Sequence, residues 1–366
     1  MLLLVMLSSS VEAVPYFARK YNLTCGSCHT LPPSLNEFGL NFVANGYTLK
    51  AVPSHPTWPL AVWATQRIER HDSQRRKFTK AFPNRVEVVS GGKLSSRTSY
   101  FLEWRPLSFE ATGQEGRLLD RSGRFEDLFL NFDISDQVSV MIGQFRMLSQ
   151  WDVSRRLSLS TPVGFAASVP GKPASKQRLS SLRSFSLEGR APAVRFSLGD
   201  PAADGWNHEV TVPFGGELSL PLTRDARDAA SFELEARPKG AFLETSRRRG
   251  LDSFGGSLFL GDDRWMAALI GQKQVGATHL YGAAGTARFR SGVQDFRMSL
   301  GHYWIPRTWF AWGSRLDHRS TDGLGVAFVP HVNVHFPGSK YTFLFVLEPF
   351  LQKDNSGVAA EISAIF

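Results

Sequence analysis

From about residue 58 onward, the chain alternates apolar and polar side chains in short segments separated by Gly, Asp, Ser and Pro. The alternation is clearest in residues 128–133, 138–143, 341–350 and 357–366. Successive side chains of a strand point to opposite faces, so each segment predicts a strand with two different faces. No apolar run approaches the eighteen or so residues that a membrane-spanning helix needs.

Many such segments of about ten residues are typical of strands that cross a membrane as a closed antiparallel barrel. The roughly 310 residues involved suit about sixteen strands. Aromatic residues cluster near predicted strand ends, as they do at membrane interfaces: Trp304, Trp309, Phe310 and Trp312. The chain also ends in Phe366 with apolar residues at every second position, which resembles the assembly signal of bacterial outer-membrane barrels.

The fold class expected is therefore all-β, an outer-membrane β-barrel, preceded by a small helical segment. A soluble β-sandwich or propeller is the alternative, but no repeat of forty to fifty residues supports propeller blades.

The chain before this region divides into three parts. Residues 1–13 resemble a secretory signal peptide without its basic start, which we interpret as a truncated or misplaced start. Residues 14–52 form a compact segment of their own, and residues 53–57 form a proline-punctuated linker. The barrel then occupies residues 58–366.

Only two cysteines occur, and both belong to the motif Cys25-Gly26-Ser27-Cys28-His29. This C-x-x-C-H spacing is that of c-type haem attachment, in which two thiols form thioethers and the histidine ligates the iron. A thioredoxin-type redox pair, a zinc site and a short disulfide are the alternatives. No βαβ unit surrounds Cys25, too few zinc ligands are nearby, and a disulfide leaves His29 without a role. We therefore expect one covalent haem c.

The haem segment contains one predicted helix. Ser34 and Glu37 have the spacing of a capping box, with Ser34 as the N-cap. Apolar residues then recur at helical spacing: Leu35, Phe38 and Phe42. A segment of about forty residues cannot enclose a haem alone, so we expect the barrel to supply the remaining wall.

The sequence leaves the ligand on the second face of the iron open. The haem segment contains no methionine, and none occurs between Cys28 and Met141. His55 in the linker is the nearest downstream imidazole and is the candidate distal ligand. Met141, Met147 and an open coordination position are the alternatives.

Residues 14–21, 25–29, 35–39 and 45–47 together resemble the fused monohaem cytochrome–porins of bacterial outer membranes. The best-known members of that family are the iron-oxidising outer-membrane cytochromes of neutrophilic and acidophilic iron oxidisers. The resemblance implies a short haem segment followed by a porin barrel. It also implies that Cys25 and Cys28 attach the haem and that His29 is the proximal ligand.

The formal net charge of +9 would suit a nucleic-acid partner, but an exported barrel does not share a compartment with nucleic acid, so no such partner is expected. Arginine-rich stretches at residues 75–77 and 247–249 are expected to contact anionic lipid headgroups or to line a lumen that favours anions. Residues 143–146 and 154–157 look like a segment shared with phosphate-selective porins.

Other residues have the chemistry to bind a metal ion. Asp262-Asp263 and Glu126-Asp127 offer the hard oxygen ligands that suit ferrous iron, although solvated turns or a polar lumen explain them as well. His331 and His335 share one strand face, and a polar lumen face again explains them equally.

These patterns predict a bacterial outer-membrane electron conduit. Electrons would pass through one haem between an extracellular donor such as Fe(II) and periplasmic cytochromes, and whether the protein is an Fe(II) oxidase stays open. One alternative is an anion-selective solute porin whose haem segment is a plug or redox sensor. The other is a soluble periplasmic haem-binding β protein.

Overall fold

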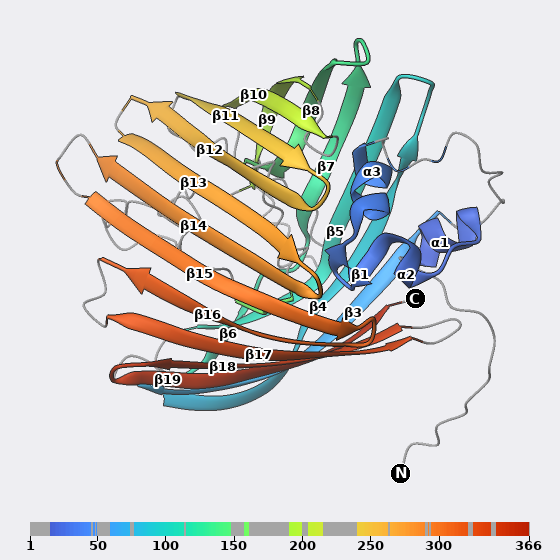
Figure 1. Cartoon of the computed structure of the whole chain (residues 1–366). Coiled ribbons are helices and arrows are strands. Elements are labelled where there is room, and N and C mark those ends of the chain that lie inside the picture. Colours follow the sequence, from blue (N-terminus) through green and yellow to red (C-terminus); the bar gives the residue numbers. More distant parts are fainter. Residues whose placement is uncertain are drawn as a thin grey trace.

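The computed structural model describes residues 15–44, 47, 49, 59–73, 77–112, 115–147, 157–160, 190–199, 204–214, 240–262, 264–289, 292, 294–320, 325–337 and 342–365. Sixteen antiparallel strands in this part of the chain close into one barrel (Figure 1). The ring is completed by the last and first strands, where Ile365 lies opposite Trp63. The predicted all-β barrel of about sixteen strands is confirmed.

The strands of the barrel wall are β3 (Ala61–Ser73), β4 (Lys77–Lys93), β5 (Thr98–Thr112), β7 (Arg124–Asp133), β8 (Val138–Arg146), β9 (Arg190–Leu198), β10 (Gly205–Pro213), β11 (Gly240–Arg249), β12 (Asp252–Gly261), β13 (Arg264–Val275), β14 (Thr278–Phe289), β15 (Gln294–Arg307), β16 (Phe310–Arg319), β17 (Val326–Pro337), β18 (Thr342–Gln352) and β19 (Asn355–Ile365). A further short strand, β6 (Arg117–Asp120), pairs with the end of β5.

Side chains alternate between the lumen and the exterior along these strands. On β15, Asp295 and Arg297 are buried, whereas Phe296 and Met298 are exposed. Polar residues thus face inward and apolar residues face outward, the reverse of a soluble sandwich. An apolar outer surface on a closed barrel matches the hydrocarbon of a membrane, so the predicted outer-membrane location is confirmed. Among the described helices, none has the length and hydropathy of a membrane span.

The predicted aromatic cluster lies around the turn between β15 and β16. Trp304 and Trp312 are exposed and their rings are 6.3 Å apart, and the rings of Trp309 and Phe310 are 5.8 Å apart. Exposed aromatic rings at strand ends suit the boundary between headgroups and hydrocarbon.

The two ends of the barrel differ. One end has tight turns at residues 94–97, 134–137, 250–251, 276–277 and 308–309. At the other end, the connections from β8 to β9 and from β10 to β11 span residues 147–189 and 214–239. Short turns are typical of the periplasmic side of such barrels and long loops of the extracellular side. The wall also begins and ends at the short-turn end, which we call the periplasmic end.

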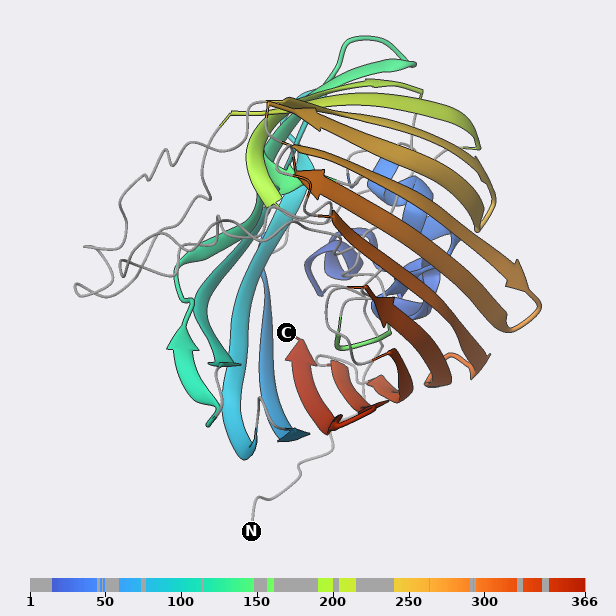
Figure 2. The same cartoon turned by 90° about the vertical axis from the view of Figure 1, so that its left-hand side faces the viewer.

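The N-terminal elements lie at this periplasmic end, within the ring of strands (Figures 1 and 2). They are α1 (Pro15–Tyr21), α2 (Cys25–Cys28), β1 (His29–Leu31), β2 (Ser34–Leu35) and α3 (Glu37–Ala44). Arg19 Nη2 donates to the carbonyl of Leu60 at 3.0 Å, and the ring of Tyr47 stacks on Phe101 of β5 with centroids 4.8 Å apart. These contacts attach the helices to the inner face of the wall.

The predicted N-cap at Ser34 is wrong. Ser34 pairs with Leu31 in a two-stranded sheet, and helix α3 begins only at Glu37. The side chain of Asn36 takes the capping role, because its Oδ1 accepts a hydrogen bond from the backbone N–H of Gly39 at 2.9 Å. The pairing of β1 with β2 therefore moves the helix start from residue 35, which a cap at Ser34 predicts, to Glu37.

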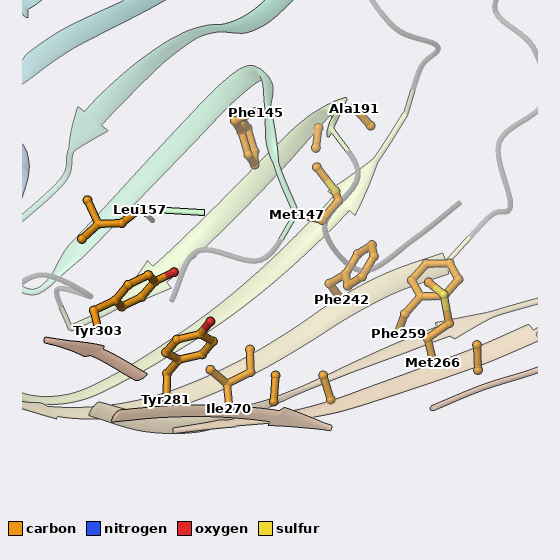
Figure 3. Packing of buried hydrophobic residues seen from close by; sticks show 14 of the residues in the cluster. Phe145, Met147, Leu157, Ala191, Phe242, Phe259, Met266, Ile270, Tyr281 and Tyr303 are labelled. Atoms are coloured by element: carbon orange, nitrogen blue, oxygen red, sulfur yellow. The ribbon is translucent and has the colours of Figure 1, made fainter. Parts of the chain in front are cut away.

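A cluster of buried apolar side chains fills part of the lumen (Figure 3). It joins Tyr281 and Tyr303 of the wall to Leu31 of β1 and to Leu157, which belongs to the long connection after β8. The rings of Tyr281 and Tyr303 are stacked with centroids 5.2 Å apart. The lumen is thus occupied from both sides, by the helices and by part of this connection.

Candidate functional site

Both cysteines of the motif lie in α2, and both are buried thiols that are not joined in a disulfide. Sγ of Cys25 lies 3.6 Å from Oγ1 of Thr342, at the start of β18. Cys28 borders a cavity instead. Burial, together with the nearby charge of Cys25, raises the pKa of the Cys28 thiol to about 11. This thiol is therefore protonated at neutral pH.

The backbone around the motif is held by hydrogen bonds from the segment that follows it. Nδ2 of Asn36 donates to the carbonyls of Gly26 at 3.2 Å and Ser27 at 3.1 Å. The backbone N–H of Asn36 donates to the carbonyl of Cys28 at 2.9 Å. A Cβ at Gly39 would lie well inside contact distance of that same carbonyl oxygen, so glycine is needed for α3 to approach the motif.

A cavity of about 450 Å³ lies between the helices and the barrel wall. On the helix side it is bordered by Cys28, His29, Leu35, Phe42 and Tyr47, a largely apolar set. The volume falls within the range of small-molecule and cofactor sites. Cys28 and His29 border this cavity among apolar neighbours, and Cys25 lies one turn before Cys28 in α2, against Thr342. A thiol, an imidazole and an apolar surround are groups that fit a c-type haem, with Cys25 as the second thiol of the motif.

The barrel side of the cavity is charged. Nη1 of Arg105 lies 2.6 Å from Glu126, and its Nε lies 2.6 Å from Glu87. Arg190 pairs with both Glu126 and Asp127, its Nε being 3.1 Å from Asp127 Oδ1. Alternating charges of this kind balance one another, and they give the cavity one apolar side and one polar side.

The Glu126-Asp127 pair, a candidate for ferrous iron, is engaged by these arginines. A metal ion would have to displace guanidinium groups from both carboxylates. In the described residues, no group of three or more His, Cys, Asp or Glu side chains is close enough to hold a metal ion.

The structure separates the other predicted ligands. His55 lies outside the described residues, so its role as distal ligand stays a prediction. Met147 is fully buried in the apolar cluster of the lumen and Met141 packs against that cluster, and neither borders the cavity. His331 and His335 are buried on the lumen face of β17, as their alternation predicted.

The arginine-rich stretches divide between the two faces of the wall. Arg247 is exposed, with its guanidinium 5.8 Å from the ring of Trp206, and Arg248 is buried in the lumen. Of residues 75–77, only Lys77 lies within the described part. Asp262 is exposed, and its neighbour at 263 lies outside the described residues.

From the sequence, Arg146 was noted only within the porin-like segment 143–146, and four other arginines that border the cavity were missed: Arg67, Arg85, Arg105 and Arg190. The available signal was that each belongs to the polar set of a two-faced segment. That signal places a residue in the lumen, but it does not tell which strands stand next to the helices.

No family model matches the chain, and no curated protein matches it in sequence. Solved structures do resemble it. An anion-selective porin from Comamonas acidovorans has a TM-score of 0.53 and 12% identity, and the match covers 84% of this chain and 98% of the porin. Salmonella typhi OmpF, in a complex with daunomycin, has a TM-score of 0.51 and 10% identity, covering 84% of this chain and 97% of OmpF.

At these identities the likeness shows the fold alone. The chain has the general barrel fold of outer-membrane porins, so the porin part of the resemblance seen in the sequence is supported. The cytochrome part rests on residues 14–52.

Proposed function

We propose that this protein holds one covalent haem c in the lumen of an outer-membrane barrel and carries electrons through it. The observation that supports this function is that Cys28 and His29 of the C-x-x-C-H motif border the 450 Å³ cavity between the helices and the wall. A partly enclosed cavity with apolar and charged sides, beside this motif, suits a cofactor that exchanges electrons without leaving the protein.

Cys25 and Cys28 would hold the haem by thioethers, and His29 would ligate the iron. Bound there, haem supplies one-electron transfer. The chain's own residues position the group and exclude water from it. Asn36 holds the motif turn, and Phe42 supplies part of the apolar side.

The position of the helices suggests the partners. They lie at the periplasmic end of the barrel, where soluble periplasmic cytochromes would approach. The opposite end carries the long connections and would meet an extracellular donor such as Fe(II), which is here a substrate. The apolar outer face of the barrel would contact lipid of the bacterial outer membrane.

Covalent attachment is tested by haem staining after denaturing electrophoresis. The wild-type chain should keep its stain, and a Cys25→Ala/Cys28→Ala variant should lose it. Ser27→Ala is the matched control, because it alters the same turn without removing a thiol. Haem that survives denaturation in the double variant would refute the attachment. Stopped-flow mixing of the purified protein with Fe(II) then tests the donor, since oxidised haem should become reduced.

A second function, which the fold supports more directly, is a solute porin with a plugged lumen. One solved structure of the same fold is an anion-selective porin. Five arginines border the cavity of this chain, against four glutamates: Glu87, Glu103, Glu126 and Glu361. Such a wall would favour anions slightly.

Conductance in planar bilayers separates the two functions. A porin should give steady single-channel currents with anion selectivity in a salt gradient, whether or not haem is present. A dedicated electron conduit should give little current with the helices in place, and it should lose its redox activity when the haem is absent.

A further inference from the structure

Residues Leu157–Ser160, which we call the inner segment, cross into the lumen and are bound by one carboxylate. Glu348 of β18 accepts hydrogen bonds from the hydroxyl of Ser158 at 2.5 Å, from the backbone N–H of Leu159 at 2.8 Å and from the backbone N–H of Ser160 at 2.9 Å. The hydroxyl of Ser160 also donates to it. Glu348 is 4% exposed, so these bonds stand in place of its solvation.

The same segment is held from a second strand. Arg315 of β16 is 1% exposed, and its Nη1 donates to the hydroxyl of Ser158 at 2.6 Å and to the carbonyl of Ser160 at 3.1 Å. Its Nη2 donates to the hydroxyl of Ser160 at 2.7 Å. Asp317 orients the guanidinium by accepting from Nε at 2.7 Å. Polar groups on two strands, β16 and β18, therefore bind the inner segment together.

This arrangement matters because the inner segment borders the haem cavity. Leu157, Ser158 and Leu159 face it together with Cys28 and His29. Thr342 of β18 touches Cys25, and Glu348 lies six residues further along the same strand, about 20 Å at 3.3 Å per residue. The cavity thus lies between the level of the helices and the level of the inner segment.

We propose that Glu348 and Arg315 are positioning residues that hold the inner segment as the cavity's far wall and so keep extracellular water from the haem. This rests on the proposed function, because it assigns the wall of the same site. The wall shields the cofactor from the side of the long connections, whereas the helices shield it from the periplasmic side. Electrons from an extracellular donor would then cross the inner segment to reach the haem, whereas the segment would stop solutes.

One test measures access to the cavity without haem. The full chain is produced without haem in a Cys25→Ser background, and the alkylation rate of Cys28 by N-ethylmaleimide is compared with and without Glu348→Gln. The variant presents amide hydrogens to N–H groups that need an acceptor, so the rate should rise by about tenfold or more. Asp295→Asn is the matched control, since Asp295 is a buried lumen carboxylate paired with Arg297 at 2.6 Å and does not border the cavity.

A second variant keeps every charge and is tested in the haem-loaded protein. Ser158→Ala/Ser160→Ala removes the hydroxyl contacts, so water should enter and stabilise ferric haem, which lowers the reduction potential. Gel mobility before and after boiling confirms that each barrel is folded. An alkylation rate within twofold of the parent in Glu348→Gln, or an unchanged potential in the double variant, overturns the proposal. A chain that never takes up haem refutes the proposed function instead, and the alkylation test still reports on the wall.

Discussion

Sγ of Cys25 lies 3.6 Å from Oγ1 of Thr342, although 317 residues separate the two in the chain. The contact joins the motif of the N-terminal helices to the first residue of β18. Because both residues are buried, this part of the interface is packed rather than solvated. The helices are thereby docked on the barrel wall near the point where the wall closes.

Thr342→Lys should detach the helices from the wall. A buried, unpaired ammonium beside Cys25 costs several kcal/mol, so the docked state should be depopulated. Trypsin should then cleave after Lys20 at least about tenfold faster than in the parent chain. Thr342→Ser keeps the hydroxyl and is the control. Equal cleavage rates in Thr342→Lys and the parent would contradict the docking described here.

Under the proposed haem attachment, Gly39→Ala should lower the fraction of chains that carry covalent haem. The added methyl group meets the backbone carbonyl of Cys28, which cannot move away without disturbing the motif, and such overpacking costs about 1–3 kcal/mol. Gly26→Ala is the matched control, because its nearest neighbour would be Thr24 Oγ1 at 3.9 Å. The measurement is haem content per chain from absorbance; similar losses in both variants would argue against the close approach of α3.

Cys28 in the haem-free chain should react slowly at neutral pH. Only the thiolate is nucleophilic, and a thiol whose pKa is raised stays protonated to higher pH. The alkylation rate should therefore climb with pH until about 11, the pKa that burial and Cys25 impose. An ordinary thiol levels off above about 8.5. A rate that reaches its plateau near pH 9 would show that Cys28 is not buried.

Glu126→Gln should destabilise the barrel more than a surface change does. Removing this carboxylate takes one partner from each arginine, while Arg105 keeps Glu87 and Arg190 keeps Asp127, so the cost should be about 1–3 kcal/mol. The control is Glu110→Gln, whose side chain is 58% exposed and lies 3.5 Å from Arg121, a pair worth about 1 kcal/mol or less. Urea unfolding in detergent, followed by tryptophan fluorescence, measures the stability of both variants. Equal unfolding midpoints would show that the ion pairs of Glu126 do not stabilise the barrel more than a surface pair does.

The barrel could be predicted from the sequence because its signal is local. Alternation in segments such as 138–143 predicts both a strand and which of its faces is apolar. The number of such segments along the chain then gives the approximate number of strands. Ser34 shows where local reasoning fails. Its capping-box spacing is real, but Ser34 pairs with Leu31, and this pairing moves the helix start to Glu37.

Of the candidate site, the sequence predicted the motif but not the residues that surround it, again because only local patterns can be read. The motif Cys25 to His29 is contiguous, so its residues stand out in the sequence. The groups around it come from far along the chain: Arg105 and Glu126 from the first half of the barrel, and Leu157 from a long connection. Barrel closure brings them together, and closure depends on the register of every strand rather than on any single segment.

The enclosure of the motif also sets an order of events in biogenesis. Cys25 and Cys28 are buried between the helices and a wall whose last pair, β19 with β3, completes the ring. While the helices are docked, both thiols are shielded from an enzyme that would deliver haem. If haem is attached there, attachment must come before the helices dock on the wall.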